Sequence, residues 1–301
     1  MTRVVAAFAL LCVVFGTTFG AIKIGIDDGW PPLLAAGARF TLGGALVLAM
    51  SCVRGKLRPL AAADVRGIAA IGLTVTTGTF AALYCAERVL PSGLAAVLSA
   101  TSPLFAVSFA IAHKRRRLDP CVLFGVALGT IGVVLVADVG SIAGGAAIVA
   151  ALAIVVSEIG YAWGLSQARG VSRTVPLLQL AGAQQVVGGC ALLALSLAFE
   201  RRGPAHLDAT GALALAYLVV IASAGAHTVS IWLASETNAT FASSWTYVSP
   251  FIALVFGAVF LHESLGVTAW IGGAFVVAGA VSLNRNVPAA LAPSAQAGPV
   301  P

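Results

Sequence analysis

The 301 residues are 59% hydrophobic and only 9% charged, with a mean hydropathy of +1.00. Soluble domains carry about 25% charged residues, so the composition excludes an ordinary soluble domain and predicts an all-α, polytopic membrane protein. The net charge of +6 does not indicate a nucleic-acid partner, because the basic residues are confined to particular breaks between apolar runs.

Apolar runs of about 20 residues, long enough to cross a bilayer, follow one another along the chain. They predict ten transmembrane helices, at residues 4–25, 32–53, 66–86, 91–113, 121–138, 143–167, 175–199, 211–233, 239–262 and 266–284. We interpret the first run as a retained helix rather than a cleaved signal, because it is long and other spans follow at once. The Pro- and Ala-rich tail, residues 287–301, is predicted to be disordered.

The second half of the chain repeats the first. Residues 249–283 match residues 102–136 at a constant offset of 147 positions and without a gap. The aligned pairs include Pro103 with Pro250, Ala106 with Ala253, Leu118 with Leu265, Gly125 with Gly272, and Gly132 with Gly279. A fixed offset of about half the chain predicts two copies of one unit, residues 1–140 and 141–286, with five helices each.

Loop charges predict the orientation. If the N-terminus is inside, the inner breaks and ends hold twelve basic residues and the outer ones hold four. The inner set is Arg3, Arg54, Lys56, Arg58, Arg66, Lys114, Arg115, Arg116, Arg117, Arg169, Arg173 and Arg285, and the outer set is Lys23, Arg88, Arg201 and Arg202. The positive-inside rule therefore predicts that both termini are cytoplasmic.

An odd number of helices in each unit places the second unit upside down relative to the first. The basic break at 114–117 then faces the cytoplasm, and the equivalent break at 262–264 faces out. Inverted repeats are typical of secondary transporters, whose substrate site lies between the repeats near the midplane of the membrane.

These residues resemble the EamA-type carriers of the drug/metabolite transporter superfamily. The resemblance covers residues 4–284 and rests on Pro250, the run 262–265 (His-Glu-Ser-Leu), Gly272 and Gly279, with Arg39 in a GARF segment also fitting the family. Arg116 departs from it, since the family usually has Glu at that position of the first repeat. The resemblance implies a bacterial inner-membrane carrier, often an exporter of amino acids or other small metabolites, and suggests contact between two copies in a homodimer.

Ionisable residues inside the spans are the main candidates for a site, because a charge in the bilayer is costly and usually functional. Glu158 lies about 15 residues into its predicted helix, or roughly 20 Å from the helix start. A buried carboxylate of this kind could carry a proton, or could simply be satisfied by neighbouring hydroxyls. His227 is expected at a similar depth, so a Glu158–His227 relay and a purely structural histidine are both open.

Arg39 is expected roughly 10 Å from the outer end of the second helix. It could bind a substrate carboxylate through its forked donors, pair with a carboxylate such as Glu87, or extend toward the interface. Tyr161, Trp163, Trp232, Trp245 and Tyr247 either line a cavity or belong to the interfacial aromatic belt.

The remaining polar residues can also be explained by ordinary structural roles. Gln179, Gln184 and Gln185 make the seventh helix polar, and Thr74, Thr76, Thr77 and Thr79 can each bond a carbonyl of their own helix. Lys23 is expected to extend to the interface, Glu236 to lie in solvent at a helix end, and Glu263 to cap a hairpin or join the repeats. The repeated prolines either expose polar backbone to a substrate path or form static kinks, and the glycines of the fifth helix permit close packing.

Other chemistry finds little support. The five cysteines form no CxxC or His/Cys metal spacing, and no Walker-type loop, GxSxG or HExxH occurs. The sequence therefore predicts no metal and no cofactor, and a small-molecule substrate and the lipid bilayer as partners. The prediction is a carrier that works by alternating access and is not an enzyme. The alternatives are a membrane enzyme acting on a lipid or isoprenoid, which would need a cluster of carboxylates or histidines, and a non-transporting interaction protein.

Overall fold

The computed structural model describes residues 2–102, 105, 109, 120–137, 144–200, 208–236 and 245–285, and within these ranges every regular element is a helix. The first half contains α1 (Thr2–Asp27), α2 (Pro32–Val53), α3 (Ala62–Ile71), η1 (Gly72–Gly78), α4 (Thr79–Ala86), α5 (Ser92–Ser99) and α7 (Pro120–Ala137). The second contains α8 (Gly145–Val171), α9 (Leu177–Phe199), α10 (Ala209–Ala216), η2 (Tyr217–Ala226), α11 (His227–Glu236), α13 (Trp245–Phe260) and α14 (Val267–Arg285).

Helices are the expected response to this sequence, because a backbone in lipid must satisfy its polar groups within its own segment. Among the described residues, six helices are long and apolar enough to cross a membrane. They are Thr2–Asp27, Pro32–Val53, Ala62–Ala86, Gly145–Ala168, Leu177–Phe199 and Ala209–Ser230. Two shorter apolar helices cover Val248–Phe260 and Val267–Gly279.

Most of the predicted spans correspond to these helices. The predicted spans at 91–113 and 239–262 fall only partly within the described residues, as α5 and α13. The tail at 287–301, the basic break at 114–117 and Pro103 lie outside them. The third and eighth spans are not uniform α-helices, because each contains a π-helical segment, η1 and η2.

Helix bounds recur at the offset found in the sequence. Adding 147 to the first residue of α7, Pro120, gives 267, where α14 begins. Adding it to η1, residues 72–78, gives 219–225, which falls inside η2. Each half therefore carries a π-helical segment at the same place.

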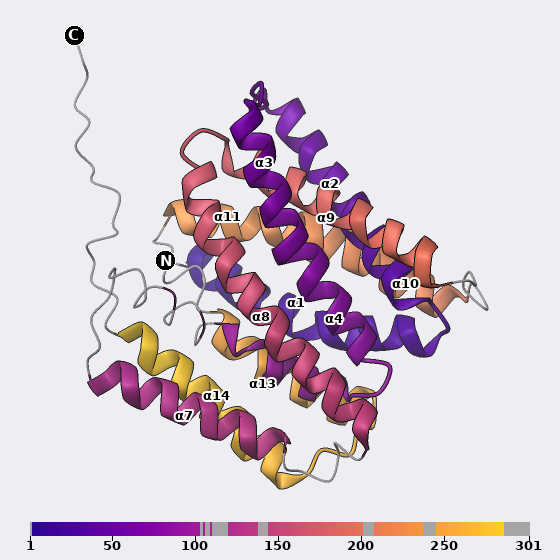
Figure 1. Ribbon diagram of the computed structural model, residues 1–301, viewed down its shortest axis with the longest axis vertical. Helices are drawn as coiled ribbons and strands as arrows, with labels where there is room; N and C mark the ends of the chain where they lie inside the picture. Colours follow the sequence, from indigo (N-terminus) through magenta and orange to yellow (C-terminus); the bar gives the residue numbers. More distant parts are fainter. Residues whose placement is uncertain are drawn as a thin grey trace.

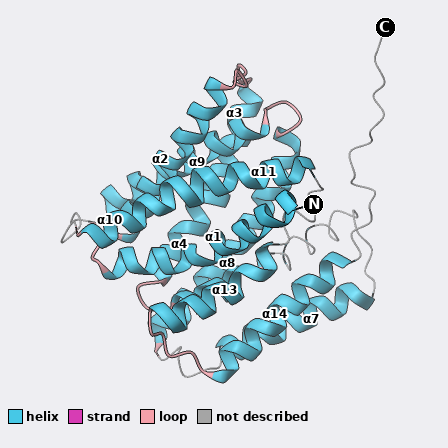
Figure 2. Ribbon diagram, turned by 180° about the vertical axis from the view of Figure 1, so that it is seen from behind, coloured by secondary structure: helices cyan, strands magenta, loops and turns pink. Residues whose placement is uncertain are grey.

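The two most extensive helix contacts each join the two halves: α2 packs along α9, and α7 packs along α14. Both views show α7 and α14 side by side at one edge of the molecule (Figures 1 and 2). Glycines allow this approach. A Cβ atom on Gly132 would lie 2.7 Å from the Gly272 carbonyl oxygen, and one on Gly279 would lie 2.7 Å from that of Gly125.

This contact is reciprocal, because Gly132 and Gly279 are repeat equivalents, as are Gly125 and Gly272. A later residue of α7 meets an earlier residue of α14, and the converse also holds, so the two helices run antiparallel. The glycines of α7 thus pack within the chain. The same pattern joins α2 and α9, where Cβ atoms on Gly44 and Gly182 would lie 2.7 and 2.9 Å from each other's carbonyl oxygen.

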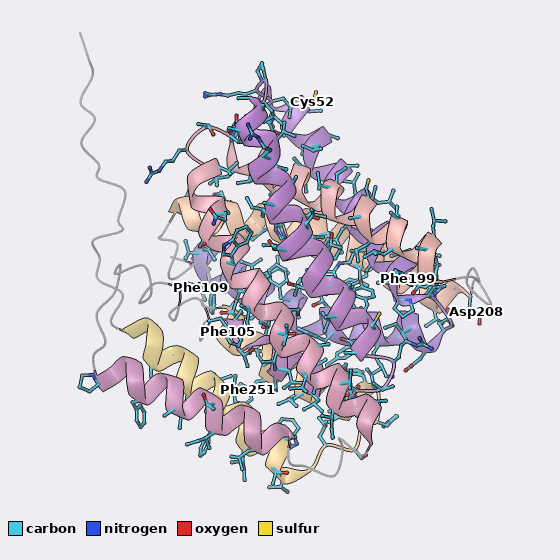
Figure 3. All side chains as sticks on the ribbon, viewed as in Figure 1. Cys52, Phe105, Phe109, Phe199, Asp208 and Phe251 are labelled. Carbon is cyan, nitrogen blue, oxygen red and sulfur yellow. The ribbon has the colours of Figure 1, made fainter. Side chains whose placement is uncertain are left out.

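Apolar side chains from both halves share one core, which includes Leu11, Tyr84, Leu94, Ile154 and Leu254. A smaller cluster of Ile68, Ile71, Val75, Val175 and Leu180 joins α3 and η1 to α9. Cys52, at the end of α2, lies far from Phe199 and Asp208 (Figure 3). α2 and α9 therefore end at opposite ends of the bundle.

Carboxylates hold helix starts at one end of the bundle, called here the capped end and defined by Asp28, Glu200 and Glu263. Glu200 accepts hydrogen bonds from the backbone N–H groups of Leu33 and Leu34, at 2.8 and 3.0 Å. Glu263 accepts from Ser92 and Gly93 at 2.6 and 3.2 Å, and Asp28 accepts from Gly211 at 3.0 Å. The N-termini of α2, α5 and α10 are thus fixed by side chains from distant helices.

Candidate functional site

Arg39 occupies a buried position between four helices. Its side chain is 4% exposed. Nε donates to Ser223 Oγ of η2 at 3.1 Å, and one terminal nitrogen donates to the Tyr84 hydroxyl of α4 at 3.3 Å. The guanidinium carbon lies 4.7 Å from the Phe40 ring centroid and 5.3 Å from that of Phe80. A cation is therefore held by neutral hydroxyls and aromatic faces.

Gln185 of α9 lies beside this group. It is 1% exposed, and neither Oε1 nor Nε2 has a hydrogen-bond partner. Its place is fixed through Gly43, one turn after Arg39 on α2: a Cβ there would lie 2.5 Å from Ser223 Cβ and 3.4 Å from Gln185 Oε1. Arg39, Tyr84, Gln185 and Ser223 thus form one cluster, the Arg39 cluster, to which both halves contribute.

His227 begins α11 directly after η2, one turn beyond Ser223. It lies close enough to Arg39 to interact with its charge. A relay with Glu158 was one of the two roles left open for His227, but the neighbours that the structure gives to these two residues differ. His227 adjoins the Arg39 cluster, whereas Glu158 adjoins Ser102 and Tyr161. The geometry therefore gives the relay no support.

Glu158 lies in the middle of α8 and is 3% exposed. Its carboxyl group is in hydrogen-bonding contact with Ser102, a residue of the other half. A carboxyl group buried in a membrane beside a neutral hydroxyl is costly to ionise. This is the setting in which a carboxyl can take up and release a proton.

The five aromatic candidates have different surroundings. Tyr161 is partly buried against the smaller core cluster and lies near Glu158. Trp245 stacks on Phe15, with ring centroids 3.9 Å apart, and packs against the main core. Trp163 is 37% exposed on the outside of the bundle. Trp232 is 38% exposed, and the side chain of Tyr247 lies outside the described residues.

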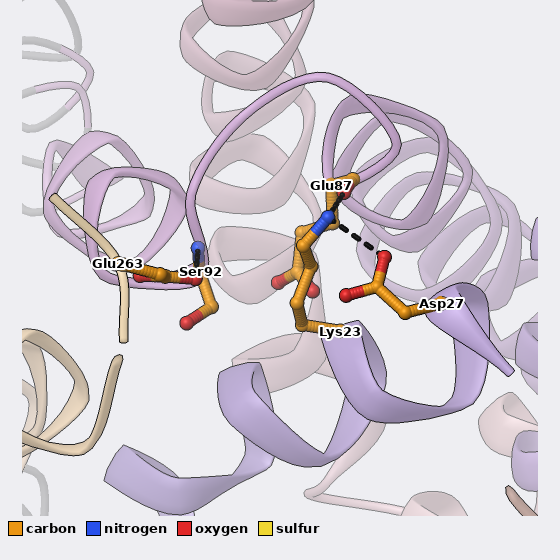
Figure 4. Close-up of polar contacts among 5 residues, drawn as sticks. All are labelled: Lys23, Asp27, Glu87, Ser92 and Glu263. Atoms are coloured by element: carbon orange, nitrogen blue, oxygen red, sulfur yellow. Dashed lines mark hydrogen bonds and ion pairs between the residues drawn. The ribbon is translucent and has the colours of Figure 1, made fainter. Parts of the chain in front are cut away.

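A second group of charges lies at the capped end (Figure 4). Lys23 Nζ pairs with Asp27 at 2.9 Å and donates to the backbone carbonyl of Glu87 at 3.0 Å. Glu87 is 0% exposed, and neither of its carboxyl oxygens has a hydrogen-bond partner. Burial, and secondarily the nearby charge of Glu263, raises the pKa of Glu87 well above its ordinary value, although Lys23 and Arg39 oppose that shift. Lys23 therefore has local partners rather than only the interface.

An Arg39–Glu87 ion pair, one of the three alternatives left open for Arg39, is absent from the described structure, where the pair within 4.0 Å joins Lys23 to Asp27. Tyr84 of α4, one turn before Glu87, is near both: it accepts a hydrogen bond from Arg39 and makes none with Glu87. Each of the two charges acts on the Tyr84 hydroxyl group. The buried carboxylate and the buried guanidinium are thus near neighbours that do not meet.

The polar residues of the middle helices divide between local and long-range roles. Thr74 bonds the Ala70 carbonyl within its own helix, as predicted. Thr76 instead donates to Gln184 Oε1 at 2.6 Å, and Thr77 donates to the Gly188 carbonyl at 3.0 Å, so both join η1 to α9. The expectation of a local bond was wrong for Thr76, whereas Thr77 also bonds the Gly72 carbonyl of its own helix, at 3.4 Å.

At the opposite end of the bundle, Gln179 bonds both backbone groups of Arg58, at 2.9 and 2.8 Å. Near the start of α1, a cavity of roughly 520 Å³ is lined by Thr2, Arg3, Val4, Trp232 and Glu236. Glu236 is thus at a helix end, as expected. The Arg39 cluster and Glu158 do not line this cavity.

The sequence identified Arg39, His227 and Gln185 individually, but not the cluster. Tyr84 and Ser223 were missed because a single tyrosine or serine in an apolar run is an ordinary residue. The available signal was the spacing: Arg39 and Gly43 share one face of a helix, as do Ser223 and His227. No group of three His, Cys, Asp or Glu side chains suited to a metal ion occurs in the part of the chain described here.

The chain is similar to known proteins in sequence and in fold. The sequence profile of the EamA-like transporter family matches residues 2–137 and again residues 147–285. The chain is 31% identical over 279 residues to the "Uncharacterized inner membrane transporter YedA" of Escherichia coli (strain K12), covering 90% of this chain and 87% of that protein. It is 33% identical over 130 residues, 43% of this chain and 41% of the relative, to a "Probable amino-acid metabolite efflux pump" of Salmonella typhimurium.

The fold also resembles a solved structure whose title reads "Crystal structure of protein". The two superpose with a TM-score of 0.65 at 18% sequence identity, over 94% of this chain and 96% of the other. At this identity the likeness concerns the fold alone.

Proposed function

The chain belongs to the EamA-like transporter family, and on that premise we propose that this membrane transporter is a secondary carrier that exports amino acids or related small metabolites. The observation that carries the proposal is the presence of buried polar groups, Arg39 and Glu158, inside spans of a chain whose relatives are transporters. The protein would be located in the inner membrane, as the name of the Escherichia coli relative says of that protein.

The proposed mechanism is alternating access between two inverted repeats, residues 1–140 and 141–286, with ten spans in total and both termini cytoplasmic. Three observations support this arrangement: the two matches to the family profile, the recurrence of helix bounds at an offset of 147, and the reciprocal antiparallel contact of α7 with α14. Two units related in this way can rock about a shared centre and open it to one side at a time.

Glu158 is the proposed coupling group. Its contact with Ser102 joins α8 of the second half to the first half, so a change in its protonation can alter how the halves meet. Tyr161, Trp163 and Trp245 remain proposed contacts for the substrate, with different support. Partial burial supports Tyr161 and Trp245, whereas the exposure of Trp163 gives it weaker support. The homodimer remains part of this proposal through the family resemblance alone.

The test is Glu158→Gln, which keeps the shape and hydrogen-bonding capacity of the side chain but removes its titration. Proton-driven flux and substrate exchange are measured in vesicles of matched protein content, beside Glu236→Gln as a control at a helix end. Uphill transport by Glu158→Gln is expected to be lost while exchange survives, because exchange need not discharge the proton. Uphill transport at the normal rate, with the normal pH dependence, would exclude Glu158 as the coupling group.

The same vesicles test the carrier itself. A carrier moves substrate across the bilayer, whereas a membrane enzyme converts it and an interaction protein does neither. Conversion of a lipid or isoprenoid without net flux would replace the proposal with the enzymatic alternative.

A further inference from the structure

We propose that the Arg39 cluster is a carboxylate-binding subsite, in which Arg39, Gln185 and Ser223 hold the carboxylate of the transported molecule. The inference rests on the proposed transport function and adds a chemical class to it: small molecules that carry a carboxylate group. The carboxylate would be bound between the two halves, because Arg39 belongs to the first half and Gln185 and Ser223 to the second.

The charge of Arg39 is unbalanced. Arg39 is 4% exposed, and its hydrogen bonds within the described part of the chain go to two neutral hydroxyls, which leaves other guanidinium N–H groups for a ligand. Removing a charge from water without a counter-ion is expensive, and a paired, hydrogen-bonded anion offsets that cost. A carboxylate is the group whose two oxygens match two parallel guanidinium donors.

Gln185 supports a bound ligand independently of Arg39. The amide of Gln185 is 1% exposed and has no partner on either its oxygen or its nitrogen. Buried amides are normally hydrogen-bonded, and each exception needs an explanation. A ligand between Gln185 and Ser223, which both approach Gly43, would supply the missing acceptor for Nε2.

The local helix geometry also supports a ligand site. Ser223 lies in η2, where the helix widens to π-helical turns, a form that often marks functional sites. The absence of a side chain at Gly43 lets Ser223 and Gln185 come close to the α2 backbone, since a Cβ there would lie 2.5 Å from Ser223 Cβ and 3.4 Å from Gln185 Oε1. Phe40 and Phe80 cover the guanidinium on its apolar side, which leaves a polar face toward Ser223 and Gln185.

The cluster favours a carboxylate over a phosphate group. Arg39 is the one cation in it, because the other nearby cation, Lys23, is already paired with Asp27 at the capped end. A single cation suits a singly charged anion better than a doubly charged phosphate.

Binding is measured by thermal shift on the purified full chain in detergent, since a ligand that binds the folded state raises its melting temperature. The probes are the protein amino acids, each beside its carboxamide, and inorganic phosphate. At least one amino acid is expected to raise the melting temperature, while its carboxamide and phosphate do not. Equal shifts from an acid and its carboxamide, or no shift with any amino acid, would overturn the subsite.

The decisive variant is Gln185→Leu, because it removes an amide that has no partner and is not expected to destabilise the protein. Affinity for the amino acid is expected to fall about 10- to 100-fold, the usual effect of losing a buried hydrogen bond to a charged group. Gln184→Leu, on the next residue, is the matched control: it breaks the bond to Thr76 and lowers the melting temperature, but leaves the ligand shift intact. Unchanged affinity in Gln185→Leu contradicts the proposal.

Flux measurements separate this proposal from the transport function on which it rests. If an amino acid shifts wild type but not Gln185→Leu and no compound is moved across vesicles, the subsite stands and the carrier fails. If a compound without a carboxylate is transported equally well by wild type and by Arg39→Lys, the carrier stands and the subsite fails.

Discussion

The contact between α7 and α14 allows one substitution to be worked out from the structure. In Gly132→Ala, the new methyl group would lie 2.6 Å from the backbone nitrogen of Val276 and 2.7 Å from the carbonyl oxygen of Gly272. Ordinary contacts of a Cβ atom begin at 3.4 Å. Both obstructing atoms belong to a helix backbone, so the two helices must separate along their line of contact.

Overpacking of this kind costs about 1–3 kcal/mol, which corresponds to a change in the unfolding equilibrium of roughly 5- to 150-fold. The loss is expected to be large because interhelical packing is the main stabilising interaction between helices in lipid. The free energy of unfolding can be followed by titrating the purified protein in mixed micelles with a denaturing detergent, using helical circular dichroism.

Gly160→Ala in α8 is the matched control, because the nearest atom to a Cβ there is 4.0 Å away. Replacing a helical glycine by alanine without a clash is stabilising by about 0.5–1 kcal/mol, so the two variants should move in opposite directions. If Gly132→Ala is as stable as wild type, the close approach of α7 and α14 is wrong. If Val276→Ala fully restores Gly132→Ala, a side chain rather than the backbone causes the clash.

Two further predictions concern charge and topology. Because the folded-state pKa of Glu87 is raised, its contribution to stability is present at low pH and is lost as the pH rises through that pKa; Glu87→Gln should therefore melt higher than wild type at pH 8 and show a smaller advantage at pH 5. A Glu87→Gln variant with a pH-independent difference would contradict this environment. In a cysteine-free background, single cysteines at His113 and Ser264 should be labelled from opposite faces of the membrane, and labelling of both from one face would refute the inverted repeats.

The helices could be predicted because their cause is local. Apolar runs separated by Pro, Gly and charged breaks specify segments such as α2 and α9 regardless of what packs against them. The offset of 147 also recurs in the helix bounds, as the starts of α7 and α14 illustrate. The π-helical segments η1 and η2 were not predicted, because nothing in residues 72–78 or 217–226 distinguishes them from α-helix by composition.

The site was harder to predict because apolar membrane helices carry no clear face. When lipid and protein are both apolar surroundings, periodicity does not tell which side of a helix is buried. Thr76 was expected to bond locally and instead joins η1 to α9, while Thr77 bonds both its own helix and α9. Gln185 and Ser223 came together through tertiary packing alone.

The carboxylate caps on α2 and α5 have a consequence for how the sequence can vary. Glu200 and Glu263 accept hydrogen bonds from backbone N–H groups, so the contact does not depend on which side chains stand at Leu33, Leu34 or Ser92. The receiving segments can drift in sequence while the contact persists, whereas loss of either glutamate leaves two backbone donors without their acceptor. Tolerance to substitution is therefore unequal across a single contact, and variation should accumulate on the side that contributes only its backbone.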